Sequence, residues 1–220
     1  MAYLSARGSG RIDAISLLRA PVSRELYTPI FPRLPAAKVP ISHLTSDAHT
    51  PTWDSAGADE LWTTHCDKGR WLGPTDTIQA DICTIPIDNL WYCRNSARTA
   101  LVTFARERLS RQLAASGAPA DIIAAAKKQF DPGVLMLGFA RRFATWKRPY
   151  LLLHDPNRLL RILSSTQRPV QLIMAGKADP SDLAGRALIE YWTMFIRQPG
   201  VRPHAMFLAD YDIHMTMRLV

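Results

Sequence analysis

Positively charged side chains are concentrated in one short segment of the second half of the chain. Four cations occur within eight residues there: Arg141, Arg142, Lys147 and Arg148. An arginine guanidinium can bind two phosphate oxygens through parallel hydrogen bonds, and a lysine ammonium supplies a compact point charge. The segment therefore indicates binding of phosphate or another small anion.

The elements around this segment alternate between short apolar runs and amphipathic stretches. Apolar runs at 135–139, 170–175 and 205–208 predict strands, and the periodicity of 149–163 and 183–196 predicts helices. Strand, helix, strand, helix, strand with short links is typical of right-handed βαβ units in a parallel sheet. The second half is therefore predicted to be α/β.

This topology predicts that three polar loops lie at one edge of the sheet. The basic segment follows the first strand, Lys177 follows the second, and Tyr211 lies between two aspartates after the third. Open α/β sheets bind their ligands at the carboxyl ends of the strands. We also expect the helix that begins near Pro149 to direct the positive end of its dipole towards this crevice.

The first half of the chain predicts helices and irregular, proline-rich segments. Apolar spacing at Ile12, Ile15 and Leu18 predicts a helix that Pro21 interrupts. Further helices are predicted over 57–73, 88–116 and 121–129, with Asp88 as the N-cap of the longest. Arginines on that helix are expected to form a solvated face: Arg98, Arg106, Arg108 and Arg111.

A strong structure breaker at 130–133, Phe-Asp-Pro-Gly, predicts a domain boundary. We therefore expect a mostly helical domain over 1–132 and the beginning of a Rossmann-like domain over 133–220.

Composition restricts the class of protein. The chain is 47% hydrophobic with a net charge of +8, which favours an anionic partner. The basic residues form neither an arginine-rich tail nor a zinc-finger pattern, so nucleic acid is not the expected partner. No apolar run approaches the roughly 20 residues that a membrane span needs. The opening residues also lack the apolar core of a secretory signal.

Three cysteines, Cys66, Cys83 and Cys93, form no CxxC pair. Their number and spacing indicate reduced thiols and a cytoplasmic protein, with no structural metal site.

Several long motifs resemble one enzyme family. FARRFATWKRPYLLLHDPNRLL, PVQLIMAGKADPSD and MFLADYDIHM resemble the start of the C-terminal domain of α-glucan (glycogen or maltodextrin) phosphorylases. VSRELYTPIFPRLPAAKVPISHLT and HTPTWDSAGADELWTTHCDKGRWLG resemble the end of their N-terminal domain. The resemblance runs in order from about residue 11 to the last residue, so the chain is expected to be a truncated internal segment.

The resemblance implies a fold and an activity. It implies a fragment of a glycosyltransferase-B fold, with the helix-rich end of the N-terminal domain followed by the first βαβαβ unit of the C-terminal domain. Enzymes of the family use inorganic phosphate to cleave terminal α-1,4-glucosyl bonds of a glucan, which releases glucose 1-phosphate. Their pyridoxal phosphate acts through its own phosphate group, as an acid and base towards the substrate phosphate.

The resemblance also implies roles for individual residues. Arg142 and Lys147 match the positions that hold the substrate phosphate. Arg141 and Tyr211 match positions beside the cofactor phosphate. The other implied substrate-binding positions are Ser46, His49 and Lys177.

The chain departs from the family pattern at three places. The interdomain Thr-Asn-Gly reads Thr45-Ser46-Asp47, which replaces an asparagine that hydrogen-bonds the glucosyl unit. A His-Gly-Glu segment reads Arg19-Ala20-Pro21. The sequence contains no lysine in the motif that anchors the cofactor covalently.

Two other interpretations remain open. A nucleotide-sugar glycosyltransferase of the same fold would also place an arginine and a lysine after this strand, to bind a diphosphate. A non-catalytic fragment would need a second chain or segment to complete the sheet, because three parallel strands leave an unpaired edge. We expect the chain by itself to be inactive.

Overall fold

The computed structural model of the chain describes residues 2–45, 49–72 and 76–219. The chain divides into two compact units, Met1–Thr52 and Trp53–Val220. The domain boundary predicted at 132/133 falls inside the second unit and stays a prediction.

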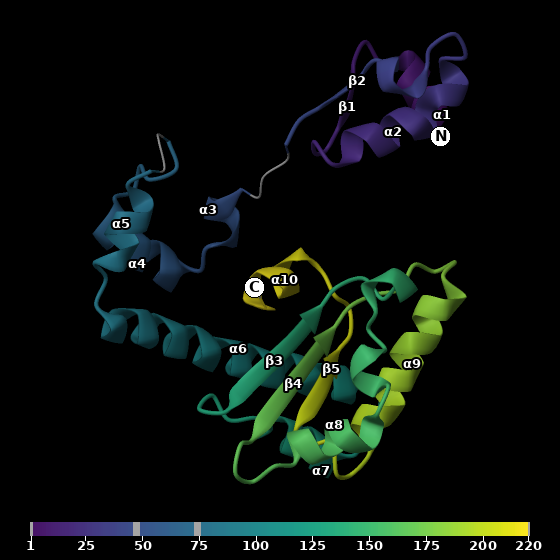
Figure 1. Cartoon of the computed structure of the whole chain (residues 1–220). Helices are drawn as coiled ribbons and strands as arrows, with labels where there is room; N and C mark the ends of the chain where they lie inside the picture. The colour runs from purple at the N-terminus through teal and green to yellow at the C-terminus, as the bar shows by residue number, and fades with distance from the viewer. Residues whose placement is uncertain (1, 46–48, 73–75, 220) are drawn as a thin grey trace. The chain divides into compact units, whose positions relative to one another are not determined.

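The first unit is a small helix-and-strand assembly (Figure 1). Its elements in chain order are α1 (Ala2–Gly8), β1 (Ile12–Ala14), α2 (Arg19–Tyr27), the 3-10 helices η1 (Thr28–Ile30) and η2 (Ala36–Lys38), and β2 (Ile41–His43). Strands β1 and β2 pair in parallel, with Ile12 opposite Ile41. The core consists of Ala14, Ala20, Val39 and Ile41.

The helix predicted from Ile12 onwards is wrong at its start, because Ile12–Ala14 form β1 and the α-helix begins only at Arg19. Helical spacing over so few positions is weak evidence, and a partner strand at 41–43 satisfies the backbone of β1 instead. Pro21 does not interrupt a helix either. It lies in the first turn of α2, where its missing N–H costs no intrahelical hydrogen bond.

The second unit begins with helices. They are α3 (Thr50–Trp53, which crosses the boundary between the units), α4 (Ala56–Cys66), α5 (Ile78–Cys83), α6 (Ile87–Ala115) and α7 (Ala120–Ala126). The long helix predicted over 88–116 is confirmed as α6. Asp88 lies in its first turn, but the N-cap is Pro86 and not Asp88.

A parallel sheet in the order β3-β4-β5 forms the centre of this unit. The strands are β3 (Leu135–Ala140), β4 (Val170–Ala175) and β5 (Ala205–Leu208). Between them lie the 3-10 helices η3 (Thr145–Lys147) and η4 (Leu151–Leu153), α8 (Pro156–Leu163) and α9 (Leu183–Arg197), and α10 (Ile213–Leu219) follows β5. The predicted parallel α/β arrangement is confirmed.

Helices cover both faces of the sheet (Figure 1). On one face α8 and α9 contribute Leu163 and Trp192 to a core with Leu172, and both of these helix side chains are fully buried. On the other face α6, α7 and α10 pack Ala105, Ala126 and Met215 against β4 and β5. All six residues of β4 are buried, which explains why its sequence is an uninterrupted near-apolar run.

The helix predicted over 149–163 is shorter than expected. After the single turn of η4, α8 begins at Pro156, because Asp155 caps it by accepting a hydrogen bond from Arg158 N. The helix dipole expected near Pro149 is therefore absent, since no α-helix begins there in the part of the chain that the structure describes.

The arginines of α6 are not a simple solvated face. Arg106 donates hydrogen bonds to the carbonyl oxygens of Gln129 and Phe130 at 2.8 and 2.6 Å. Arg108 reaches the segment that follows β5, where it donates to Ala209 O at 3.4 Å. These two side chains instead connect α6 to the loops beside the sheet.

Candidate functional site

The carboxyl ends of the three parallel strands meet at one edge of the sheet. The loop after β3 carries the basic segment, the loop after β4 carries Lys177, and the segment after β5 carries Tyr211. The structure therefore places the three predicted loops on the same edge.

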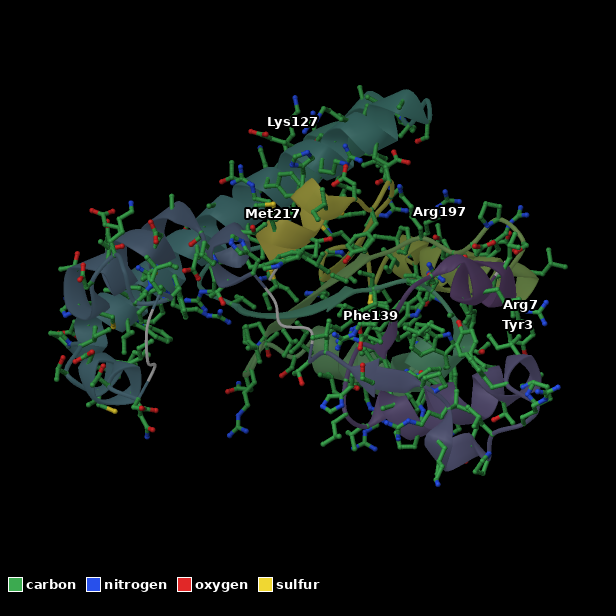
Figure 2. All side chains as sticks on the ribbon, turned by 90° about the horizontal axis from the view of Figure 1, so that it is seen from above. Tyr3, Arg7, Lys127, Phe139, Arg197 and Met217 are labelled. Atoms are coloured by element: carbon green, nitrogen blue, oxygen red, sulfur yellow. The ribbon has the colours of Figure 1, made fainter. Side chains whose placement is uncertain are left out.

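Hydrogen bonds fix the first loop to the second. Arg141 N donates to Ala175 O at 3.1 Å, and Phe143 N donates to Lys177 O at 2.8 Å. These bonds continue the β3–β4 ladder beyond the strands. The ring of Phe143 is completely buried and packs edge-on against Phe139, at 5.5 Å between ring centroids. Phe139 is labelled in Figure 2.

Two glycines allow the basic loop to approach its neighbours closely. A Cβ on Gly176 would lie 2.1 Å from Arg141 O, and a Cβ on Gly185 would lie 2.3 Å from Phe143 O. Any larger residue at these positions would displace the backbone of the basic loop. The positions of Arg141 and Arg142 thus depend on one glycine directly after β4 and one in α9.

The third loop is tied to the first by a tyrosine. Tyr211 donates its hydroxyl proton to Ala140 O at 3.1 Å. Asp212 accepts a hydrogen bond from Met215 N at 2.8 Å, which caps the first turn of α10. Asp210 adopts a positive φ of 56°, a conformation that aspartate tolerates better than most residues.

Three cations at this edge are available to a ligand. The side chains of Arg141, Arg142 and Lys177 are exposed, and none forms a hydrogen bond or salt bridge with the described residues. Lys147 is half-buried, with its ammonium 3.9 Å from the centre of the Trp146 ring. The structure thus brings the predicted residues onto joined loops, but it shows no direct contact among their charged groups.

Two carboxylates accompany these cations and were missed from the sequence. Ser181 donates through its hydroxyl and its N–H to Asp179, which lowers the pKa of that carboxyl, and the charge of Arg142 acts in the same direction. The hydrogen bond from Met215 N lowers the pKa of Asp212, with a smaller contribution from Lys177. Both aspartates precede turns or helices at capping spacing, which is the signal that could have identified them.

Two of the predicted substrate-binding residues, Ser46 and His49, belong to another part of the chain. Ser46 lies outside the described residues. His49 belongs to the first unit, is exposed, and lies 2.7 Å from the Thr52 hydroxyl through its Nδ1. Their roles therefore stay predictions.

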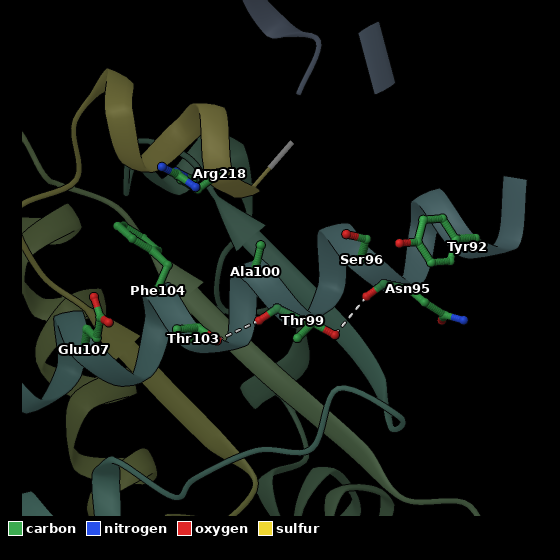
Figure 3. Close-up of a pocket in the computed structure, with 9 residues that line it drawn as sticks. All are labelled: Tyr92, Asn95, Ser96, Thr99, Ala100, Thr103, Phe104, Glu107 and Arg218. Atoms are coloured by element: carbon green, nitrogen blue, oxygen red, sulfur yellow. Dashed lines mark hydrogen bonds between the residues drawn. The ribbon is translucent and has the colours of Figure 1, made fainter. Parts of the chain in front are cut away.

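A pocket of about 720 Å³ lies elsewhere, between α6 and α10 (Figure 3). Its Thr99 and Thr103 hydroxyls donate to helix carbonyls four residues earlier, so those protons are already in use. Glu107 and Arg218 line the same pocket with opposite charges. Nothing in this lining selects a phosphate group.

Searches for other kinds of site were negative. Within the residues that the structure describes, no helix is long and apolar enough to cross a membrane. The described part of the chain also contains no group of three or more metal-ligating side chains.

Known proteins show the same sequence pattern over the entire chain. A glycogen phosphorylase of Mycobacterium tuberculosis is 36% identical over 224 residues, which cover 100% of this chain and 25% of that protein. The chain is homologous to a segment of glycogen phosphorylases. A maltodextrin phosphorylase of Thermococcus litoralis is 28% identical over the entire chain, and a glycogen phosphorylase of Aquifex aeolicus is 30% identical over 95% of it.

This chain spans about a quarter of the length of these relatives. No protein-family model matches it. The resemblance seen in the sequence motifs is confirmed.

Proposed function

We propose that this chain supplies the phosphate-binding loops of an α-glucan phosphorylase. The reaction is attack of inorganic phosphate on a terminal α-1,4-glucosyl bond, which yields glucose 1-phosphate and a shortened glucan. The names of the relatives support this substrate class. The fold we propose is the glycosyltransferase-B arrangement, in which β3–β5 begin the C-terminal domain, and the proposed location is the cytoplasm.

One observation carries the proposal: three cations without partners project from loops that hydrogen bonds hold together. Arg141 and Arg142 follow β3 directly, and the adjacent loop carries Lys177. Because these side chains have no hydrogen bond or salt bridge within the described residues, a bound anion would not have to displace a protein carboxylate. Hydrogen bonds between the loops already hold the backbone that carries them, which reduces the entropy lost on binding.

The proposed roles follow from the chemistry of the side chains. Arg142 and Lys147 would hold the substrate phosphate, with a bidentate guanidinium on one side and an ammonium on the other. Arg141 would offset the repulsion between that phosphate and a second one beside it. Ser46, His49 and Lys177 would contact the substrate.

Pyridoxal phosphate is the cofactor of this proposal, and the residues present fit its phosphate group. When bound, the cofactor supplies a second phosphate that exchanges a proton with the substrate phosphate. Arg141 carries a guanidinium without a partner in the described residues. The Tyr211 hydroxyl donates its single proton in a hydrogen bond to Ala140 O. It could donate a hydrogen bond to a phosphate only if this hydrogen bond were broken.

The first prediction is that Arg142→Gln weakens binding of phosphate and of glucose 1-phosphate by at least about tenfold. Loss of one charge-assisted hydrogen-bonding pair corresponds to about 1.5–3 kcal/mol. Isothermal titration calorimetry with the 220-residue chain measures this change. Arg158→Gln is the matched control, because Arg158 is an exposed arginine of α8 outside these loops. Equal affinity in the two variants would contradict the proposal.

The same titration distinguishes a phosphorylase segment from a nucleotide-sugar transferase. Tighter binding of ADP-glucose or UDP-glucose than of phosphate would favour a nucleotide-sugar transferase. For activity, the chain is incubated with maltoheptaose, phosphate and pyridoxal phosphate, and glucose 1-phosphate is measured. We expect product only when the chain is combined with the part of a phosphorylase that lies outside its match.

A further inference from the structure

Strand β5 forms an outer edge of the sheet, and the side chain of a glutamine occupies much of that edge. In a parallel ladder, alternate residues of a strand direct both N–H and C=O towards the same neighbour. Leu172 N bonds to His204 O, so the even-numbered residues of β5 face β4 and the odd-numbered ones face outward. Gln112 of α6 donates to Phe207 O at 3.1 Å and accepts from Ala209 N at 2.8 Å. One side-chain amide thus makes the pair of bonds that an adjacent strand would make.

The remaining outward groups leave no room for another strand. Gln129 donates to Ala205 O at 2.9 Å, and Ala205 N donates to Val201 O at 3.1 Å. In the part of the chain that the structure describes, Phe207 N is the outward N–H of this edge that lacks a partner. An added strand would therefore gain one new donor and break several existing hydrogen bonds, so this edge is closed to strand pairing.

A groove of about 820 Å³ runs along this closed edge. Helices α6 and α9 cover opposite faces of the sheet and both contact β5, and α7 packs against α6 (Figure 1). The apolar side chains from these three helices that line the groove include Leu109, Leu113, Ile122, Ala126, Ile189 and Ile196. Small-molecule sites have volumes of roughly 300–1,000 Å³ and are mostly apolar, so the groove has the size and lining of such a site.

The charged side chains of this groove are all positive and lie near the amino end of β5. They are Lys128, Arg197 and Arg202, and all three are exposed. Arg202 donates to Arg197 O at 3.0 Å, and Gln129, which follows Lys128, donates to Arg202 O at 2.6 Å. Among the described residues, no aspartate or glutamate lines the groove, and the side chains of Lys128 and Arg197 have no hydrogen bond or salt bridge. One end of the groove is therefore cationic, and the rest is largely apolar.

The geometry points to this groove as a binding site for an anionic amphiphile, namely a monomeric fatty acid of medium chain length. The carboxylate lies among Lys128, Arg197 and Arg202, where guanidinium groups offer paired hydrogen bonds to its two oxygens. The alkyl chain lies along β5 between α6 and α9. Residues 205–209 span roughly 13 Å of extended backbone, which sets the length of chain that the groove can shelter. Burial of the alkyl chain supplies most of the affinity, and the cations select the head group.

A membrane surface and a second copy of the chain fit the groove less well. Insertion into a membrane requires apolar side chains that protrude. Here they are recessed, because Ala126 and Ile196 are buried and Ile122 and Ile189 are half-buried. A symmetric contact between two copies would place the same patch on both partners and would bring their three cations together, which is unfavourable.

Titration of the 220-residue chain with two surfactants of equal chain length tests the site. Dodecanoate and dodecyltrimethylammonium are compared by isothermal titration calorimetry, below the concentrations at which they form micelles. We expect saturable binding of dodecanoate, and binding of the cationic surfactant that is at least about tenfold weaker. Absence of saturable dodecanoate binding, or equal affinity for the two surfactants, would overturn the proposal.

A charge variant locates the carboxylate. Arg197→Gln is expected to weaken dodecanoate binding at least about threefold, because an exposed cation contributes modestly. Arg186→Gln is the matched control, since Arg186 is an exposed arginine of the same helix outside the groove. Equal affinity in the two variants would count against this position of the head group and overturn the proposal.

A steric variant locates the alkyl chain. Ala125 is exposed on α7 and lines the groove, so Ala125→Phe would fill part of it without removing a core side chain. Ala124→Phe, at the neighbouring exposed position outside the groove, is the matched control. We expect at least about tenfold weaker dodecanoate binding only in the Ala125 variant, with both chains showing the same circular dichroism. Unchanged binding in a folded Ala125→Phe chain would overturn the proposal.

Three further results would also overturn it. Binding to phosphatidylglycerol vesicles without binding of monomeric dodecanoate would favour a membrane surface. Dimers in sedimentation that Ala125→Phe abolishes, again without dodecanoate binding, would favour a second copy. Loss of dodecanoate binding in Arg142→Gln would place the fatty acid at the carboxyl edge of the sheet instead. We expect Arg142→Gln to bind dodecanoate like the unaltered chain and Arg197→Gln to bind phosphate like it, so the phosphate and fatty-acid proposals can fail separately.

Discussion

Glycine residues, rather than charged ones, determine where the cations of the basic loop lie. Gly176 follows β4 and lies against the carbonyl of Arg141, and Gly185 lies in the first turn of α9 against the carbonyl of Phe143. At both glycines the neighbouring carbonyl oxygen lies too close to leave room for a Cβ atom. The arginines can therefore reach the sheet edge only because two neighbouring positions have no side chain.

Gly176→Ala is predicted to destabilise the fold by about 1–3 kcal/mol, the usual cost of overpacking. The added methyl group would contact Arg141 O and the buried Phe143 ring. Chemical denaturation measures the change in the free energy of unfolding. Gly138→Ala is the matched control, because its new methyl group meets open space. The packing argument would be wrong if both variants unfolded at the same denaturant concentration.

The sequence predicted the types of residue at this edge but not their partners. Arg141, Arg142 and Lys177 follow apolar runs, so their place at strand ends could be read from the chain. The hydrogen bond from Tyr211 to Ala140 O joins residues 71 positions apart. No local pattern contains that information.

At the scale of secondary structure, buried strands were predicted best. The apolar runs at 170–175 and 205–208 coincide with β4 and β5, because both strands are covered on two faces and their sequences are nearly continuous in apolar residues. Strand β1 was missed because its three residues form a strand only by pairing with β2. The paired residues, such as Ile12 and Ile41, are 29 positions apart in the sequence. The start of α8 was misplaced because Asp155 caps a helix that is preceded by a separate 3-10 turn.

Gln112→Ala is predicted to reduce stability by about 1–3 kcal/mol, the cost of leaving buried polar groups unsatisfied. Phe207 O and Ala209 N both lose their partner at the β5 edge. Native-state hydrogen exchange should show faster exchange of the Ala209 amide. Arg111→Ala on the same helix is the control, since Arg111 is exposed and, within the residues that the structure describes, bonds only to a carbonyl of its own helix. Unchanged exchange at Ala209 would exclude this bridging role for Gln112.

At the scale of the molecule, electrostatics sets the response to acid. The chain carries a net charge of +8 at neutral pH, and protonation of its carboxylates adds to that positive charge. In the second unit, the almost completely buried Arg70 side chain bonds to Asp59 at 2.7 Å and to Asp54 at 3.2 Å. The hydrogen bond from Arg70 lowers the pKa of Asp59.

Asp59→Asn is therefore predicted to flatten the dependence of the melting temperature on pH in the acid range. A carboxyl whose folded-state pKa is lowered stabilises the fold above its ordinary pKa and loses that contribution as pH falls through the folded value. The wild-type chain should lose more stability than the variant between pH 5 and about pH 2. Thermal melts across this range measure the difference, with Asp121→Asn as the control at an exposed position of α7. Parallel curves for wild type and Asp59→Asn would contradict this assignment.

The sequence by itself determined the α/β class, the order of the three strands in the chain and the relationship to phosphorylases. Apolar runs, helical periodicity and long motifs are local properties of the chain. Each can be recognised in the sequence without knowing which residues lie nearby in the folded structure. Only the tertiary structure decided which edge of the sheet is closed, which glycines hold the basic loop, and that Arg106 and Arg108 bond to distant loops. Those outcomes depend on backbone groups and side chains that are tens of positions apart, and they exist only once packing has brought them together.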